Sequence, residues 1–266
     1  MCPSEGGAVT ISDLGSFDRA LHIAHMVLGG IFPFWRGHGN FDWPLTAEVF
    51  RTGPRGKAHP EVTLIRTFMA QAESRSQRCP AYSDFVGWLM LARHFRLPTR
   101  LLDWSMSPLV ALFFAVGERH DDVDGALWAL SPGRLNERMI GQNRVLLVDD
   151  PEVMELVKLA FVPDQSVHDE AKPRTTGRAL AIGAREIDPR VMVQQGAFTI
   201  HGDGIDLAAI PPQPHQTPPL VVGFRVERSA KPALRQLLER YGITRGALFP
   251  DLGSLADELK HKPWSG

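Results

Sequence analysis

Cysteine is scarce in this sequence, which carries only Cys2 and Cys79 among its 266 residues. Two distant cysteines have neither the paired spacing of a zinc site nor the density of a disulfide framework. His22 and His25 lie three residues apart, but no third ligand follows at a recognisable metal spacing. We therefore expect no bound metal and a reducing compartment, which we take to be the cytoplasm.

An excess of charge of either sign is also absent. Lys and Arg together number 29 and Asp and Glu 30, which gives a formal net charge of −1. This balance argues against binding of nucleic acid or of an anionic membrane through the net charge of the whole chain. No stretch approaches the roughly 20 apolar residues that cross a bilayer, and the first residues lack the basic start and apolar run of a signal peptide. We expect a soluble protein without a membrane partner.

Two common catalytic signatures are missing as well. The sequence has no Gly-rich phosphate loop that ends in Lys followed by Ser or Thr, and no Gly-x-Ser-x-Gly elbow. Phosphate-loop nucleotide hydrolysis and serine hydrolase chemistry therefore lack their usual sequence support.

The apolar content, in contrast, is ordinary: 44% of the residues are hydrophobic, enough for a full core. We predict an α+β fold whose mixed, mostly antiparallel sheet is flanked by helices. The expected organisation is an N-terminal helical segment (1–29), a core domain (30–205), and a C-terminal strand and helices that pack on the core (206–266).

Helices are predicted where apolar residues recur at three-and-four spacing. The first is expected to begin after Ser12 or Ser16 as its cap and to end at Gly29-Gly30. Pro108 suits the first position of another helix. The expected helices are 16–28, 60–72, 82–95, 108–119, 151–161, 232–241 and 252–259.

Strands are predicted where short β-branched or aromatic runs are bounded by turn residues. The first run ends at Arg36, before a Gly-His-Gly-Asn turn. Gly196 suggests a bulge at the start of a late strand, and a proline-rich connector over 211–219 precedes the last one. The expected strands are 31–36, 125–131, 144–148, 179–182, 191–193, 197–201 and 220–226.

The most informative segment is Gly87–Glu118, where ionisable residues lie between two strongly apolar helical stretches. We expect a polar turn after Pro98 that brings its side chains close to the core. Buried charge needs a partner or a ligand. Two interpretations remain open. The turn forms a ligand site with Trp104, or it closes on itself, with Arg100 paired to Asp103 and Ser107 capping the next helix. The polar residues of the turn are Arg100, Asp103, Ser105 and Ser107.

Three further positions carry chemistry that a ligand could use. Arg36, between Trp35 and Gly37, could fork onto a phosphate while the glycine lets the ligand approach the backbone; an ion pair with Asp42 or Asp103 is the alternative. His94 lies on an apolar helix, where a lone histidine is more often a hydrogen-bonded core residue than a ligand or base. Gln195 could hydrogen-bond a sugar hydroxyl but cannot act as a base or carry negative charge; ordinary edge-strand polarity is the alternative.

These motifs resemble the FRG domain family, which is named for an aromatic-Arg-Gly motif. Trp35-Arg36-Gly37 represents that motif here, with tryptophan in place of phenylalanine. The resemblance spans roughly Phe32 to His201, and Leu248–Leu252 resembles the tail that often follows the domain. Two departures add positive charge: Arg93 stands where glutamine is usual, and Arg96 where glycine is usual. The other matching segments are 43–45, 50–51, 92–115 and 195–201.

A second, weaker resemblance is to ADP-ribosyltransferases. The order of an Arg-Gly strand, a Ser-x-Ser-Pro turn before an apolar helix, and a late strand with a polar entry residue matches the three-part site of that group. The resemblance implies that Arg36 holds the phosphate or ribose region of NAD, that Ser105 and Ser107 support the nicotinamide half, and that Gln195 stands where a glutamate would stabilise the ribosyl cation.

The resemblances imply an NAD-binding protein that transfers ADP-ribose to a protein or nucleic-acid acceptor, or hydrolyses NAD, in a bacterial stress, toxin or phage-defence setting. Because Gln195 is neutral, the missing charge must come from another carboxylate, with Asp103 first and Glu118 and Glu186 behind it. One alternative is a non-catalytic module that recognises a nucleotide, a nucleic-acid end or a protein segment. Another is a structural interaction domain. The expected catalytic residues are Arg36, Asp103, Ser105 and Gln195, and the expected cofactor-binding residues are Trp35, Arg36, Gly37, His94, Arg100, Trp104 and Ser107.

Overall fold

A seven-stranded sheet forms the centre of the computed structural model, which describes residues 9–30, 32–51, 60–76, 78–162, 177–184, 189–211 and 218–261. The strands are β1 (Thr10–Ile11), β2 (Phe34–His38), β3 (Leu101–Ser105), β4 (Gly125–Leu130), β5 (Ala179–Gly183), β6 (Gly196–His201) and β7 (Val221–Val226). Their order across the sheet is β1-β7-β4-β2-β3-β6-β5. β1 and β7 are parallel, and the other neighbours are antiparallel. The predicted α+β class is confirmed.

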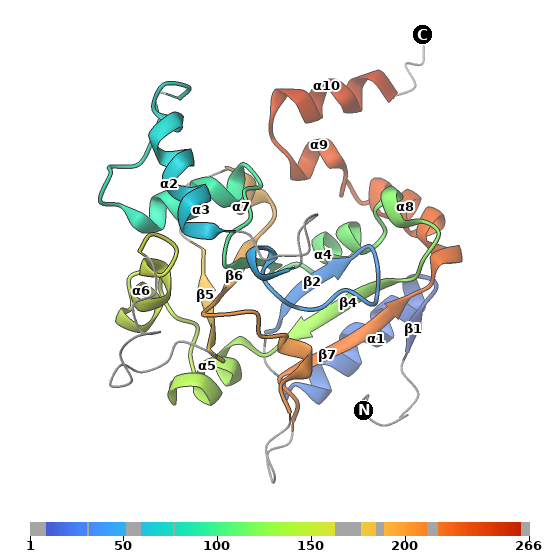
Figure 1. Cartoon of the computed structure of the whole chain (residues 1–266). Coiled ribbons are helices and arrows are strands. Elements are labelled where there is room, and N and C mark those ends of the chain that lie inside the picture. Colours follow the sequence, from blue (N-terminus) through green and yellow to red (C-terminus); the bar gives the residue numbers. More distant parts are fainter. Residues whose placement is uncertain are drawn as a thin grey trace.

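Helices surround this sheet (Figure 1). The α-helices are α1 (Leu14–Val27), α2 (Glu61–Ala72), α3 (Phe85–His94), α4 (Pro108–Ala115), α5 (Pro132–Ile140), α6 (Pro151–Lys158), α7 (Pro189–Val193), α8 (Lys231–Arg240), α9 (Arg245–Leu248) and α10 (Leu252–His261). Short 3-10 helices are η1 (Glu48–Phe50), η2 (Glu118–His120), η4 (Leu207–Ala209) and η5 (Arg228–Ala230). Within the described residues, no helix combines the length and the apolar character needed to cross a bilayer.

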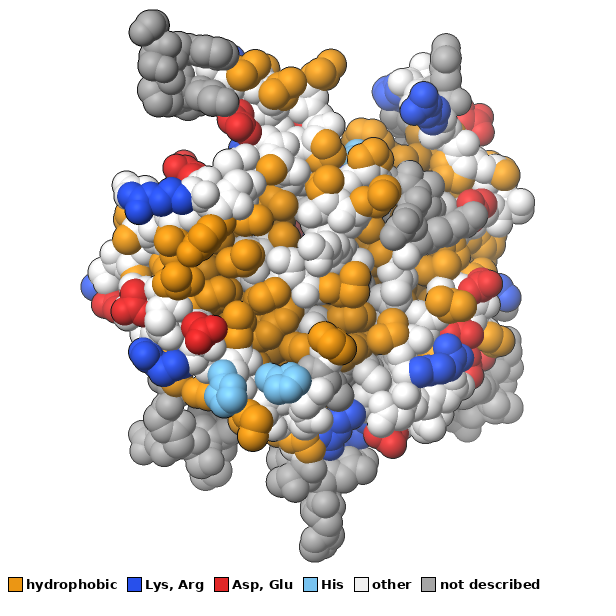
Figure 2. All heavy atoms as spheres, turned by 180° about the vertical axis from the view of Figure 1, so that it is seen from behind, with side chains coloured by type: hydrophobic (Ala, Val, Ile, Leu, Met, Phe, Trp, Pro, Cys, Tyr) orange, Lys and Arg blue, Asp and Glu red, His pale blue; other side chains and the backbone are white. Residues whose placement is uncertain are grey.

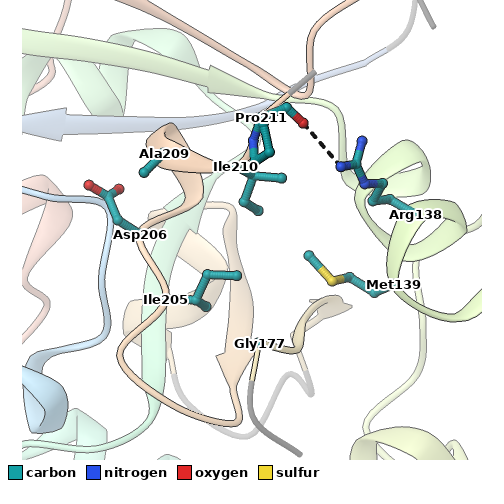
Figure 3. Close-up of a pocket in the computed structure, with 8 residues that line it drawn as sticks. All are labelled: Arg138, Met139, Gly177, Ile205, Asp206, Ala209, Ile210 and Pro211. Atoms are coloured by element: carbon teal, nitrogen blue, oxygen red, sulfur yellow. Dashed lines mark hydrogen bonds between the residues drawn. The ribbon is translucent and has the colours of Figure 1, made fainter. Parts of the chain in front are cut away.

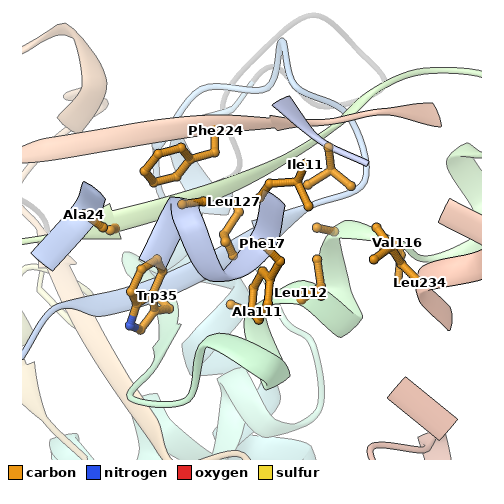
Figure 4. Packing of buried hydrophobic residues seen from close by; sticks show 14 of the residues in the cluster. Ile11, Phe17, Ala24, Trp35, Ala111, Leu112, Val116, Leu127, Phe224 and Leu234 are labelled. Atoms are coloured by element: carbon orange, nitrogen blue, oxygen red, sulfur yellow. The ribbon is translucent and has the colours of Figure 1, made fainter. Parts of the chain in front are cut away.

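The first hydrophobic core lies between α1, α4 and α8 and the strands β2, β4 and β7 (Figure 4). Trp35 and Leu127 from the sheet meet Phe17, Leu112 and Leu234 from the helices. All five residues are buried, and a buried large apolar side chain contributes about 1.5–3 kcal/mol to folding. Trp35 is therefore a core residue.

Two further cores pack on the sheet. One covers β3, β5 and β6, and the other lies on the opposite face of the sheet from the first two cores. α2, α3 and α6 pack on β3, β5 and β6. On the opposite face, the loop after β2 packs with α5 and η4 against the sheet. Leu101 belongs to the first of these cores and Leu102 to the second, as expected for neighbours in a strand, whose side chains alternate between faces.

The sheet is weakly joined between β2 and β3. These strands share one residue pair, Trp35 with Ser105, whereas β2 and β4 share five pairs. β2 contributes Trp35 to the first core, whereas β3 contributes Leu101 to the core under α2, α3 and α6. The β2/β3 junction therefore lies between strands that belong to different apolar cores.

Gly37 allows α4 to lie directly on β2. A Cβ atom at this position would lie 1.8 Å from Ala111 O and 2.6 Å from Ala115 N. The sequence suggested that a ligand would approach the backbone at Gly37. In the structure, α4 occupies the space beside this glycine.

Gly37→Ala is expected to lower the free energy of unfolding by about 3 kcal/mol, the upper end of the range for overpacking, because both clashing atoms belong to a helix backbone. Gly117→Ala is the control, since its nearest contact would be an ordinary 3.6 Å from Phe114 O; it is expected to stay within about 0.5 kcal/mol. Urea unfolding of the two variants measures the difference. Equal stabilities would contradict this account of Gly37.

The expected polar turn between two helices is wrong, because residues 101–105 form the interior strand β3. All five residues of β3 pair with β6. Leu101, Leu102 and Trp104 fit a strand buried on both faces, and this tertiary pairing outweighs the turn character of the flanking Pro98 and Ser107.

Other elements differ from the prediction in smaller ways. Residues 191–193 belong to α7 rather than to a strand, and 144–148 contributes a single bridge, from Leu146 to Ile182. Arg36 lies in the middle of β2, not at its end. The cap of α1 is Asp13, which accepts a hydrogen bond from Ser16 N. The sequence did not predict β1, α5 or α9, and most of the 211–219 connector lies outside the described residues.

Candidate functional site

Arg36 extends from β2 into the β2/β3 junction. Its NH1 group donates to the backbone oxygen of Asp103 and lies 3.9 Å from Asp103 Oδ2. Its Nε donates to His38 Nε2 at 2.8 Å. Burial lowers the pKa of Arg36 to about 9, with the Asp103 charge opposing this shift. Arg36 therefore remains a cation at neutral pH, held by both sides of the junction.

Asp103 and Glu48 are paired by one arginine, Arg93 at the end of α3. Arg93 Nε donates to Asp103 Oδ1 (3.0 Å) and Oδ2 (3.1 Å), and its NH1 donates to Glu48 Oε2 (2.7 Å). Burial alone would raise the pKa of the Asp103 carboxyl, but the Arg93 ion pair outweighs it and lowers this pKa to about 2. The Asp103 side chain is nevertheless 40% exposed. Asp103 is thus a carboxylate that is ionised at neutral pH and that solvent can reach.

Positive charge exceeds negative charge around this carboxylate. Arg51 donates from Nε to Thr46 O (2.9 Å), and its charge acts on Glu48, Arg93 and Asp103. His38 adds no charge, because burial followed by the Arg36 charge lowers its pKa to about 2. We call Arg36, Arg51, Arg93, Glu48 and Asp103 the polar cluster; its three cations and two anions leave one net positive charge, which favours an anionic ligand.

Ser105 and Gln195 lie next to the polar cluster. Ser105 is two residues beyond Asp103 on β3, so the two side chains share one face of the sheet, and it pairs in register with Gly196. Its Oγ donates to Gln194 O at 2.7 Å. Gln195 O accepts from Met106 N at 2.8 Å, and the Gln195 residue is exposed. The structure therefore places Arg36 beside Asp103, Ser105 two residues further along β3, and Gln195 against Met106, the residue that follows β3.

Arg100 is not part of this group, and its expected pairing with Asp103 is wrong. It is paired with Glu61, through Nε (3.0 Å) and NH2 (2.6 Å) to Oε2, and its backbone N donates to Oε1 at 2.7 Å. NH1 donates to His201 O at 3.2 Å. Both side chains are 6% exposed. Arg100 is a buried structural residue.

The two tryptophans also point away from the polar cluster. Trp35 lies in the first core. Trp104, which is 4% exposed, donates from Nε1 to Thr199 Oγ1 (3.1 Å), and Thr199 Oγ1 lies 2.9 Å from His201 Nε2. Neither indole is open to a stacked base.

Two expected binding residues, Ser107 and His94, make contacts within their own segments of the chain. Ser107 caps α4, its Oγ accepting from Val110 N at 3.4 Å, as the structural interpretation predicts. His94 follows Arg93 at the end of α3, and its ring lies edge-on to Phe95 at 4.8 Å between centroids. Glu118, a reserve carboxylate, is exposed in η2 and acts on Arg235 of α8.

The sequence reasoning did not assign roles to Glu48, Arg51, Arg93 and His38. Arg93 carried a usable signal, because it was recognised as an added positive charge beside the expected site. Phe50-Arg51 was also noted as a matching segment. Glu48 carried no such signal. Glu186, the other reserve carboxylate, lies outside the described residues.

The polar cluster does not line either of two open surface hollows. One, of about 330 Å³, lies between α5 and the η4 segment (Figure 3) and includes Arg138, Met139 and Asp206. The other, of about 340 Å³, lies between the start of α1 and α8. In the described part of the chain, His, Cys, Asp and Glu form no group of three suited to a metal. A ligand at the polar cluster would bind at an open surface by charge and hydrogen bonds.

Comparison with known families finds a match over part of the chain. Residues 33–124 match the FRG domain, which confirms that resemblance for the segment that contains β2, η1, α3 and β3. The matched segment supplies all five residues of the polar cluster, whereas Gln195 lies beyond it. No curated protein and no solved structure matches the chain.

Proposed function

With residues 33–124 matching the FRG domain, we propose that the chain binds a phosphate-bearing nucleotide of the NAD class at the polar cluster. The chain then cleaves the N-glycosidic bond of this nucleotide, by ADP-ribose transfer or by hydrolysis. The observation that carries this proposal is the ionised, solvent-reachable carboxylate of Asp103 within an excess of arginines. Arginine suits phosphate because its planar group donates two parallel hydrogen bonds.

The proposed chemistry follows from the charges. The nicotinamide ring leaves with the bonding electron pair of the glycosidic bond, and the ribosyl group becomes a cation. Asp103 stabilises this developing positive charge, because it remains ionised at neutral pH. Arg36 and Arg51 hold the phosphates, and the Gln195 amide bonds to a ribose hydroxyl. Water or an acceptor hydroxyl then attacks the sugar carbon and loses its proton to solvent.

The second candidate function is recognition of a similar nucleotide without turnover. It is favoured by the Arg93 ion pairs, which neutralise much of the charge on Asp103 and Glu48. Gln195, as a neutral amide, cannot replace that charge. The two functions share the ligand and differ in whether Asp103 acts on it.

Titration calorimetry with NAD, combined with mass spectrometry of the products, tests the proposal. Wild type is expected to bind NAD and release nicotinamide. Asp103→Asn should bind NAD but lose a factor of about 10²–10³ in turnover, the usual cost of one positioned transition-state charge. Arg36→Lys, which keeps the charge and loses the planar fork, should weaken binding about tenfold.

Arg144→Ala is the matched control, because Arg144 forms an exposed ion pair with Asp150 far along the chain from the polar cluster. It should bind and turn over NAD as wild type does. Binding without nicotinamide release in wild type would select the recognition function. An absence of NAD binding in wild type would refute both.

A further inference from the structure

The C-terminal segment around α9 lies against α7, the helix that leads into β6 (Figure 1). Gln194 Nε2 donates to Leu248 O at 2.9 Å. The Arg190 guanidinium lies over the Phe249 ring, 4.4 Å from its centroid. Leu248 and Phe249 are buried together with Val110 of α4. α9 therefore connects α7 with α4.

The turn after α7 is also bound to β3 on its other side, through Ser105 and Met106. Gln195 in this turn has a φ of 46°, a left-handed conformation that costs a non-glycine residue about 1–2 kcal/mol. A residue in such a conformation persists only where the surrounding contacts hold it. Ser105 Oγ and Met106 N hold the turn from β3, and α9 holds it through Gln194.

We infer that the segment of Leu248 and Phe249 is a positioning element of the candidate site, which fixes the turn that carries Gln195 at the end of β3. The mechanical part of this inference stands on the contacts alone. Its effect on a ligand rests on the proposed function. Leu248 and Phe249 touch the residues that carry Gln195, so they act through the turn and not on the ligand.

Arg190 gives α9 a second connection to the site. Its charge is among those that keep Asp103 ionised, and its NH1 lies 3.5 Å from His94 O. The Phe249 ring holds this guanidinium in place by a cation–π contact, which is worth about 0.5–2 kcal/mol. Loss of the ring would remove this contact from a cation whose charge acts on Asp103.

α10 braces α9 but leaves an exposed face. Thr244 Oγ1 donates to Glu258 Oε2 at 3.2 Å, which ties the start of α9 to α10. Leu252, in contrast, is 83% exposed at the start of α10. It is therefore a suitable control position: an apolar residue close to Phe249 in sequence that does not pack on α7.

Amide hydrogen exchange followed by NMR tests the positioning. In Phe249→Ala, the amides of Gln195 and Met106 should exchange about tenfold faster than in wild type, because local opening of the turn becomes easier. Amides of the β4–β7 ladder should be unchanged. Phe249→Tyr keeps the ring and should match wild type, as should Leu252→Ala. Unchanged exchange at the turn, or an equal rise across β4 and β7, would overturn the inference.

NAD binding of the same variants links the positioning to the site. Phe249→Ala should raise the Kd for NAD about tenfold, and Phe249→Tyr should restore wild-type affinity. If wild type binds no NAD, the proposed function fails and the exchange data alone decide the positioning. If the turn loosens in Phe249→Ala while NAD affinity stays the same, the turn does not belong to the binding site and the inference is overturned.

Discussion

Arg100→Ala is expected to lower the free energy of unfolding by about 3–5 kcal/mol, the cost of removing one partner from a buried ion pair. Glu61 would keep the hydrogen bond from the backbone of residue 100 but lose the two from the guanidinium. Its carboxylate would then lie at 6% exposure without a compensating charge. Urea unfolding monitored by circular dichroism measures this loss.

Arg144→Ala is the matched control for burial. Arg144 also forms a two-pronged ion pair, with Asp150, but its side chain is 47% exposed. An exposed pair contributes about 0–1 kcal/mol. Replacing both buried partners, with Arg100→Met and Glu61→Leu together, should recover most of the loss. A loss in Arg100→Ala no greater than in Arg144→Ala would contradict the structural role of Arg100.

Acidification is expected to destabilise the fold between about pH 6 and pH 4, through His38 and His201. Burial is the main cause that lowers the pKa of His38 to about 2 and that of His201 to about 3, whereas an unfolded histidine titrates near 6.5. In this window the unfolded chain therefore binds more protons than the folded chain, so stability falls as the pH falls. Each histidine contributes about 1.4 kcal/mol per pH unit.

Unfolding free energies at half-unit steps of pH measure this slope, and His201→Gln separates the two contributions. Glutamine does not titrate, so the variant should show about half the wild-type slope between pH 6 and pH 4. Asp103 contributes mainly below this window, because its pKa is lowered from 3.8 to about 2. A wild-type stability that is flat from pH 6 to pH 4 would contradict the buried neutral state of both histidines.

Arg100 was assigned to the site because residues 101–105 were predicted as a turn and not as a strand. In a turn, residues 100 and 103 can face each other, and their opposite charges suggest a pair. In the structure, Arg100 lies just before β3 and Asp103 lies within this strand. Arg100 pairs with Glu61 of α2, whereas Asp103 pairs with Arg93 of α3. Both partners follow from how helices pack on the sheet, which residue spacing does not reveal.

Other parts of the prediction succeed because their signals are local. The helices at 60–72 and 232–241 follow from apolar periodicity and lie close to α2 and α8. Ser107 before Pro108 predicts a cap, and the cap is present. Arg36, Asp103, Ser105 and Gln195 were grouped as a site through a resemblance, and that grouping stays a prediction; in the structure, Arg36 NH1 lies 3.9 Å from Asp103 Oδ2. The residues between 191 and 193 were misassigned because three apolar residues fit a short strand and a helical turn equally well.

The narrow join between β2 and β3 gives the proposed ligand a mechanical role. Arg36 belongs to one half of the sheet and Asp103 to the other, and the backbones of these strands share one residue pair. A ligand that binds both residues would link the two strands across the junction. A ligand that binds the folded junction but not the unfolded chain also stabilises the fold. The free energy of unfolding rises by about 2.7 kcal/mol when the free ligand concentration is one hundred times the Kd. The segment that matches the FRG domain would then be most stable with its ligand bound.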